Sequence, residues 1–292
     1  MIAEKRKVIK WNETSSIIGN YCVSVELVWI AVEIILKICF DGKELVRFAC
    51  SPIDCEDLAI GFLFTEGIIS SLEDIDHIIK NQNEHRIEFI LAEKNKSFVK
   101  GWAQSRTMSS GCGQGVISNL EYRRKHLKPV EFKVNTNIKS LPLLFKHLVN
   151  NSEWYDKTGC IHSVSLFFND GNVIIREDIG RHNAVDKVIG CALQCKFNFE
   201  NTLLYSSGRI SSDMMLKAAK AQIPVVVSKT APTSLSIDIA NESGITLIGF
   251  ARGRRLNIYT HPKRIDFDNI QEKDLLNELF ENEGYLKTNN SY

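Results

Sequence analysis

Several features that would place this chain outside the cell are missing. Its eight cysteines, at positions 22, 39, 50, 55, 112, 160, 191 and 195, form no Cys-x-x-Cys pair. Residues 1–12 are charged and lack the apolar core of a signal peptide. We therefore expect a cytoplasmic protein whose cysteines stay reduced and serve mostly as small buried apolar groups.

A long uncharged apolar run is missing too. The most apolar stretch, residues 21–40, contains Glu26, Glu33 and Lys37, which would lie inside a bilayer if the stretch crossed one. We therefore expect no membrane association and interpret this stretch as buried structure of a soluble protein.

Neither sign of charge is in excess. The formal net charge of +1 argues against a broad basic surface for nucleic acid, so a phosphate site would have to be local. The content of 44% hydrophobic and 24% charged residues is typical of globular proteins, and 292 residues suffice for two domains.

Turn residues and apolar patterns indicate a strand-rich first half. Residues 13–50 predict strands with a hairpin turn at 40–43, because an Asp-Gly pair tolerates positive φ angles. Pro52, Asp54 and Gly67 bracket a helix, two strands are expected within residues 85–99, and the glycine-rich residues 108–116 predict a loop. We predict a smaller α+β domain over residues 1–135.

Strands and helices alternate after residue 140. We expect helices near residues 141–150, 182–195, 212–221 and 234–241, and strands near 161–168, 172–176, 202–205, 224–228 and 246–250. This alternation predicts an α/β domain over residues 136–272, with a largely parallel sheet covered by helices, and a peripheral tail over 273–292.

Polar loops follow the predicted strands, at residues 177–183, 206–211, 230–233 and 251–255. Because ligands of open α/β sheets bind at the carboxyl ends of strands, we expect these loops to converge on one anion site. Arginines offer forked donors for phosphate, and small or hydroxyl residues allow close backbone approach. The candidates are Arg181, Arg209, Arg252, Arg254, Arg255, Ser207, Gly208, Ser211 and Thr233.

Two further patterns carry reactive side chains. Cys112 lies in the loop SSGCGQG at residues 109–115, where flanking glycines leave its sulfur accessible; a structural loop thiol is the alternative. In EDIGRHNAVDK at residues 177–187, His182 and Asp186 share a helix face and are expected to orient one another or a ligand. In the alternative interpretation, Asp178 or Asn183 caps this helix.

The pair Cys160 and His162 suggests either a metal site or a second reactive thiol. Position 164 is valine, and the paired spacing of zinc ligands is missing, so we expect no metal. Cys191 and Cys195 share an apolar helix face and receive no role.

Taken in order, these motifs resemble the FdhD family of formate dehydrogenase accessory proteins. The resemblance covers about residues 25–265. Its motifs are SPIDCEDLAIGFLFTEG (51–67), the Cys112 loop, TGCIH (158–162), EDIGRHNAVDK (177–187), SGRIS (207–211), APT (231–233) and GFAR (249–252).

The resemblance implies a sulfur carrier. A cysteine desulfurase would load sulfur onto Cys112 as a persulfide, for delivery to the bis(molybdopterin guanine dinucleotide) molybdenum or tungsten cofactor that formate dehydrogenase needs. It also implies a cytidine-deaminase-like core without zinc, and a homodimer. The expected cofactor contacts are Phe250, Ala251, Arg252, Gly253, Arg254, Arg255, Ser207, Gly208, Arg209, Thr233, Arg181 and His182.

The Cys112 loop departs from the family pattern, which commonly has two cysteines. Gly115 or Ser109 stands in place of the second one. A single thiolate still suffices to take the outer sulfur of a persulfide. Cys160, where glycine is more usual, is interpreted as a buried substitution. The competing functions are a cofactor-binding chaperone that does not use Cys112 and a deaminase-like hydrolase that binds zinc.

Overall fold

The computed structural model describes residues 1–13, 21–92, 123–131, 136–252 and 255–267. Cys112, Gly253, Arg254 and the predicted tail at 273–292 lie outside these residues. Among the described helices, none is long and apolar enough to cross a bilayer.

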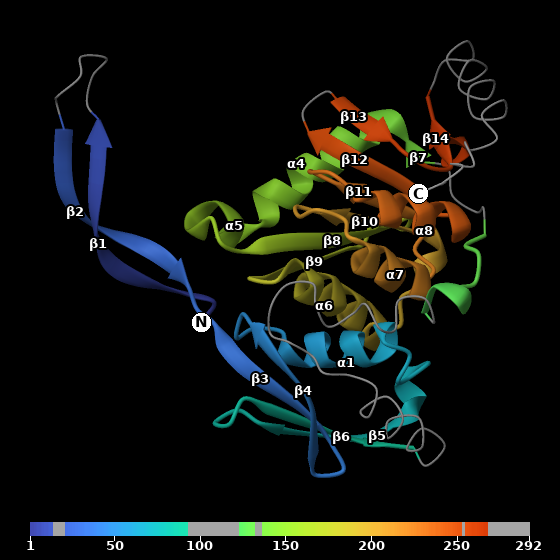
Figure 1. Ribbon diagram of the computed structural model, residues 1–292, viewed down its shortest axis with the longest axis horizontal. Coiled ribbons are helices and arrows are strands. Elements are labelled where there is room, and N and C mark those ends of the chain that lie inside the picture. Colours follow the sequence, from blue (N-terminus) through green and yellow to red (C-terminus); the bar gives the residue numbers. More distant parts are fainter. Residues whose placement is uncertain (14–20, 93–122, 132–135, 253–254, 268–292) are drawn as a thin grey trace, which may run out of the picture.

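The chain begins with a two-stranded antiparallel ribbon that extends away from the rest of the molecule (Figure 1). It pairs β1 (Ala3–Glu13) with β2 (Tyr21–Ala31) in the register Ile9↔Val25 and Trp11↔Val23. These side chains share one face of the ribbon and are 59% to 75% exposed. The expectation that residues 21–40 are buried is therefore wrong for their first half, because in the described chain β1 and β2 form a sheet of two strands.

A second sheet has the strand order β4-β3-β6-β5 and packs against α1 (Cys55–Thr65). The sheet consists of β3 (Ile34–Phe40), β4 (Lys43–Cys50), β5 (Ile75–Asn81) and β6 (Arg86–Leu91), with the turn η1 (Leu72–Asp74) before β5. Asp41 and Gly42 have positive φ angles, which confirms the predicted hairpin turn. β6 is one of the two strands expected within residues 85–99, and residues 93–99, where the other was expected, lie outside the described chain.

The large sheet has the order β13-β12-β11-β10-β8-β9. Its strands are β8 (His162–Phe168), β9 (Val173–Asp178), β10 (Thr202–Ser206), β11 (Val225–Ser228), β12 (Thr246–Arg252) and β13 (Arg255–Ile258). Only the β10–β11 and β11–β12 pairs are parallel. The expected largely parallel sheet is therefore mixed, since β8 and β9 form a hairpin and β13 folds back on β12.

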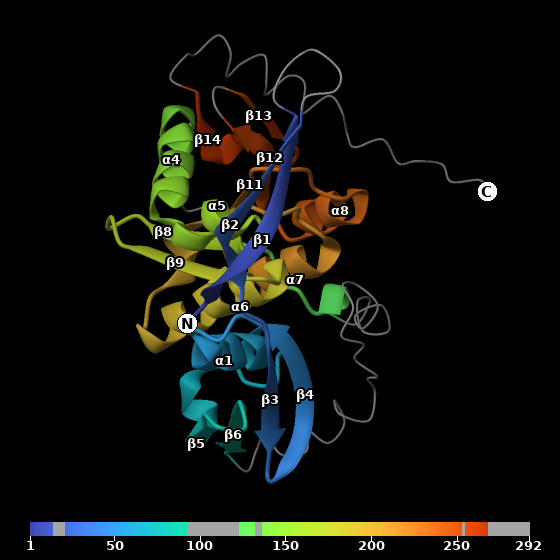
Figure 2. The ribbon, with the colours of Figure 1, turned by 90° about the vertical axis from the view of Figure 1, so that its left-hand side faces the viewer.

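Helices cover both faces of this sheet, as Figure 2 shows. On one face α4 (Leu141–Asn151) buries Leu141 and Leu148 against Tyr205 and its neighbours. On the other lie α6 (Arg181–Gln194), α7 (Ser212–Lys220) and α8 (Ser234–Glu242). The α/β class is confirmed, whereas the cytidine-deaminase-like core remains a prediction. The shorter elements are β7 (Thr136–Asn137), η2 (Ile138–Ser140), α5 (Glu153–Thr158), η3 (Phe199–Asn201), η4 (Pro262–Arg264) and β14 (Ile265–Asp266).

The two halves of the chain meet where α1 crosses α6. A Cβ atom on Gly61 would lie 1.9 Å from the carbonyl oxygen of Asp186, and one on Gly190 would lie 1.9 Å from that of Asp57. Only glycine fits at this backbone contact, and it lets the two helices approach closely. The predicted domain boundary at residue 135 stays a prediction, and residues 132–135 are outside the described chain.

Candidate functional site

The sequence-predicted loops converge at one edge of the large sheet. Strands β10 and β11 end together in the register Ser206↔Ser228, and β8 begins beside them, with Val164 opposite Ser206. His162 in turn pairs with Asp178 at the end of β9. The expectation that the polar loops share one edge is confirmed by this register.

The loop after β10 is fixed through its backbone. Ser207 N donates to the carbonyl oxygen of Ser163 at 3.0 Å, and Ser228 Oγ donates to that of Gly208 at 2.7 Å. A Cβ on Gly208 would lie 3.1 Å from Arg181 Cβ and 3.3 Å from His162 Nδ1. Glycine therefore allows the loop to contact both side chains, and the structure places Ser207, Gly208, Arg181 and His162 together.

Three helices begin at this edge. Their N-cap residues are Gly180 for α6, Ser211 for α7 and Thr233 for α8. Free backbone N–H groups at helix starts attract anions, and the exposed Arg209 and half-buried Arg181 add positive charge there. This arrangement supports the predicted anion site.

Two histidines at the edge are held neutral. Burial lowers the pKa of His182 to about 4, and its Nε2 lies 3.0 Å from Ser211 Oγ. Burial and the neighbouring Arg181 also lower the pKa of His162, whose buried Nδ1 has no hydrogen-bond partner among the described residues. The His162 ring thus offers an unused hydrogen-bonding atom beside Gly208.

Asp186 and His182 do not orient one another, so that half of the sequence expectation is wrong, whereas their orienting a ligand stays a prediction. Asp186 is buried and accepts hydrogen bonds from Lys217 and Thr65 instead. The capping alternative also needs revision, because the N-cap of α6 is Gly180. Asp178 Oδ1 supports that turn by accepting from Gly180 N at 2.8 Å.

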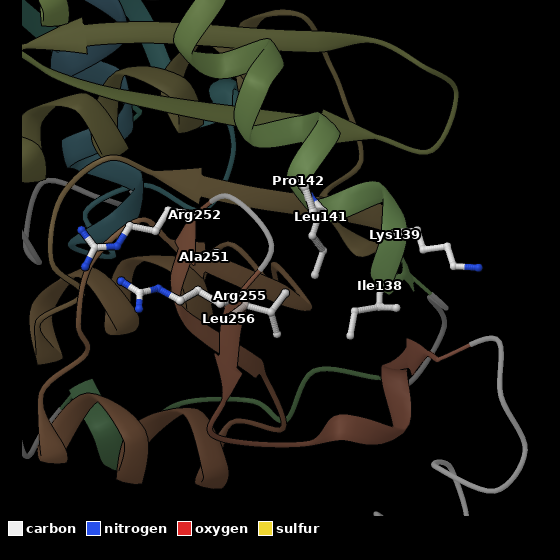
Figure 3. Close-up of a pocket in the computed structure, with 8 residues that line it drawn as sticks. All are labelled: Ile138, Lys139, Leu141, Pro142, Ala251, Arg252, Arg255 and Leu256. Carbon is white, nitrogen blue, oxygen red and sulfur yellow. The ribbon is translucent and has the colours of Figure 1, made fainter.

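An arginine pair lies at the end of β12, beside a hollow of about 330 Å³. Arg252 pairs with Arg255 across a bulged hairpin, and both extend in the same direction in Figure 3. Phe250 has a positive φ of 52° and donates its N–H to Thr230 at 2.8 Å. Lys139 also lines the hollow. No local sequence pattern points to it, because the hollow brings it together with residues more than a hundred positions later. The lining residues are Ile138, Lys139, Leu141, Pro142, Ala251, Arg252, Arg255 and Leu256.

The described chain resumes after the Cys112 segment at Arg123. Its Nη1 lies 2.7 Å from Asp213 Oδ1 and 3.0 Å from Glu66 Oε1. Asp213 Oδ2 is also 4.0 Å from His182 Nε2, so Arg123 is anchored next to the sheet edge.

Cys160 is exposed, so its interpretation as a buried substitution is wrong. Cys195 is exposed as well, while Cys39, Cys50 and Cys191 are buried. Within the described ranges, no group of three or more His, Cys, Asp or Glu is placed to hold a metal ion. The absence of zinc stays a prediction.

Known proteins are similar to this chain in both sequence and fold. A curated relative named sulfur carrier protein FdhD, from Wolinella succinogenes, is 35% identical over 241 residues, covering 82% of each chain. A relative of the same name from Sulfolobus acidocaldarius is 38% identical over 242 residues, covering 82% of this chain and 91% of the other.

A solved structure agrees with these relatives. The crystal structure of a candidate formate dehydrogenase accessory protein from Desulfotalea psychrophila matches with a TM-score of 0.72 at 26% identity. The match covers 91% of this chain and all of the other. The model of the FdhD/NarQ family matches residues 31–266. This chain therefore belongs to the FdhD/NarQ family.

Proposed function

We propose that this chain is a sulfur carrier for formate dehydrogenase maturation. It takes sulfur from a cysteine desulfurase onto Cys112 and delivers it to the bis(molybdopterin guanine dinucleotide) cofactor of molybdenum or tungsten. The observation that supports this most directly is the sheet edge where arginines, hydroxyl groups and three helix starts converge. The sulfur-transfer chemistry is inferred from the curated relatives, which are named sulfur carrier proteins.

Sulfur loading needs only one cysteine. The Cys112 thiolate attacks the outer sulfur of the desulfurase persulfide, and a new S–S bond forms on Cys112. The bond between the outer sulfur and the desulfurase cysteine breaks, and that cysteine leaves as a thiolate. Atoms and charge balance without an added oxidant, so the missing second loop cysteine does not prevent loading.

The cofactor is cargo, and the residues at the sheet edge fit its phosphates. Arg252 and Arg255, which line the hollow, offer forked donors that extend in the same direction (Figure 3). The loop from Ser207 to Arg209, together with Arg181, presents a second set of donors. Phe250, Ala251, Thr233 and His182 complete the proposed contacts.

The exposed ribbon supports the proposed homodimer. Its apolar face comprises Ile9, Trp11, Val23, Val25 and Leu27. Exposed apolar patches on the order of 500 Å² commonly mark interaction sites. Two such faces from two copies would bury about 1,000 Å² in total, the lower limit for a specific interface. A second copy of the chain is therefore the partner that we propose for this face.

A cofactor-binding chaperone is the second candidate function. The residues proposed to contact the cofactor do not include Cys112, so cofactor binding alone would not require its thiol. The chaperone and the sulfur carrier therefore predict different behaviour when Cys112 is replaced.

Complementation separates these two functions. The chain is expressed in a bacterial strain that lacks its own family protein, and formate dehydrogenase activity is measured. For a sulfur carrier, Cys112→Ala and the pair Arg252→Gln/Arg255→Gln both abolish the activity, whereas Lys43→Gln in the exposed β3–β4 turn does not. Full activity with Cys112→Ala would overturn the carrier and favour the chaperone.

A further inference from the structure

A lysine outside the sequence motifs lies directly after β11. Lys229 N donates to the carbonyl oxygen of Ser206, the last residue of β10, at 3.0 Å. The residue as a whole is half-buried. The backbone of Lys229 is therefore fixed at the sheet edge, where the loops after β10 and β11 begin.

Two aromatic side chains hold the ammonium of Lys229. Its Nζ lies 5.6 Å from the ring centroid of Phe145 on α4 and 4.8 Å from that of Tyr155 on α5. The ammonium also donates to Tyr155 Oη at 3.2 Å. Aromatic rings attract a cation through their π faces, so these contacts fix the position of the charge without neutralising it.

No carboxylate among the described residues forms an ion pair with Lys229. The buried Lys217, by contrast, is paired with Asp186 at 2.8 Å. An ammonium has three N–H donors, and Tyr155 accepts from one of them. Lys229 therefore keeps both its positive charge and two N–H groups for an anionic ligand.

Strand order places Lys229 between the two sets of donors that we propose for the cofactor. β11 lies between β10, which leads into the loop 207–209, and β12, which ends at Arg252. Neighbouring strands are about 4.8 Å apart, so β10 and β12 are separated by roughly 10 Å. Two linked phosphates match this spacing better than a single phosphate does.

We propose that Lys229 is a ligand-binding residue of the sheet edge and contacts a diphosphate group. This inference rests on the proposed function, because the bis(molybdopterin guanine dinucleotide) cargo contains diphosphates. Phe145 and Tyr155 hold the ammonium in place before the ligand arrives, so less side-chain freedom is lost on binding. The diphosphate supplies the counterion, and Lys229 connects the donors after β10 with Arg252 at the end of β12.

Isothermal titration calorimetry with guanosine diphosphate and with inorganic pyrophosphate tests this role. Lys229→Met keeps an apolar stem against both rings but removes the charge. Loss of a charge-assisted hydrogen bond should weaken the binding of both probes by about 10- to 100-fold. Lys229→Arg keeps the charge and should recover most of the affinity. Pyrophosphate that binds Lys229→Met as tightly as the natural chain would overturn the proposal.

Lys220→Met provides the matched control. Lys220 is also half-buried, lies 5.6 Å from the ring centroid of Phe64 and has no ion pair within the described part of the chain. It is the last residue of α7, whereas the start of that helix lies at the sheet edge. Lys220→Met should therefore bind both probes like the natural chain. An equal loss of affinity in Lys220→Met and Lys229→Met would contradict a local contact.

Urea denaturation of the same variants separates binding from folding. If Lys229 served only to pack α4 and α5, Lys229→Met would lower the free energy of unfolding and leave the affinity unchanged, which would overturn the proposal. A natural chain that binds neither probe would overturn the whole cofactor site together with the role of Lys229. Binding that survives in Lys229→Met would overturn the role of Lys229 alone.

Discussion

Lys217 Nζ lies 2.8 Å from Asp186 Oδ2, and the two side chains are only 4% and 2% exposed. The pair joins α7 to α6. Thr65 at the end of α1 donates to the same carboxylate at 2.8 Å. One buried ion pair thus links α6 to α7, and its carboxylate is also hydrogen-bonded to α1 in the first half of the chain.

Removing one partner of this pair should destabilise the fold strongly. Lys217→Met leaves the Asp186 carboxylate buried without its counterion, and such losses cost about 3–5 kcal/mol. The free energy of unfolding, measured by urea denaturation at pH 7, should fall by this amount. The exposed pair of Lys157 and Glu153 provides the control, because Lys157→Met should cost less than about 1 kcal/mol. Equal losses of unfolding free energy in the two variants would contradict a stabilising role for the buried ion pair.

The stability of the protein should depend on pH through His182. Its pKa is about 4 in the folded chain, below the ordinary value of 6.5, because burial disfavours the charged ring. Between pH 6.5 and pH 4, His182 is therefore protonated in the unfolded chain but stays neutral in the folded chain. The stabilisation is complete above pH 6.5 and is lost as the pH falls toward 4, by on the order of 3 kcal/mol.

Replacing the ring tests this pH dependence. His182→Gln should flatten the decline in unfolding free energy between pH 7 and pH 4.5, whereas His77→Gln on the exposed side of β5 should leave it unchanged. An unaltered decline in His182→Gln would show that other groups cause it.

The ribbon should set the oligomeric state. Ile9 and Val25 are paired neighbours on its apolar face, so Ile9→Glu/Val25→Glu places charge at the centre of the proposed dimer contact. Sedimentation should show a dimer for the natural chain and a monomer for this variant. Ser24→Glu, on the opposite face, should remain dimeric. A monomeric natural chain at tens of micromolar would rule out the contact.

Local sequence patterns predicted most of the α/β domain. Asp-Gly and Asn-Asp-Gly turns, alternating apolar residues and helix starts depend on neighbours in the chain, so their positions agree with the structure within a few residues. Strand direction does not depend on neighbours alone. The Asn169-Asp170-Gly171 turn predicts the hairpin of β8 and β9, but no local pattern shows that this hairpin places β8 antiparallel to β10.

Long-range contacts were the part that the sequence did not reveal. An apolar residue such as Val25 looks the same in a core as on an exposed ribbon, so burial was predicted where exposure is found. The ion pair of Asp186 and Lys217 spans 31 positions, and Lys139 and Arg252, which line the same hollow, are more than a hundred positions apart. The loops at the sheet edge were predicted because a general rule places ligands at strand ends.

Sulfur loading onto Cys112 is the most direct test of the proposed function. The purified chain is incubated with a cysteine desulfurase and cysteine, and its intact mass and peptides are measured, with Cys112→Ala as the control. The sulfur carrier predicts one added sulfur on the Cys112 peptide and none on that peptide in the variant. An unmodified Cys112 peptide, with sulfur on Cys160 or on no cysteine, would contradict it.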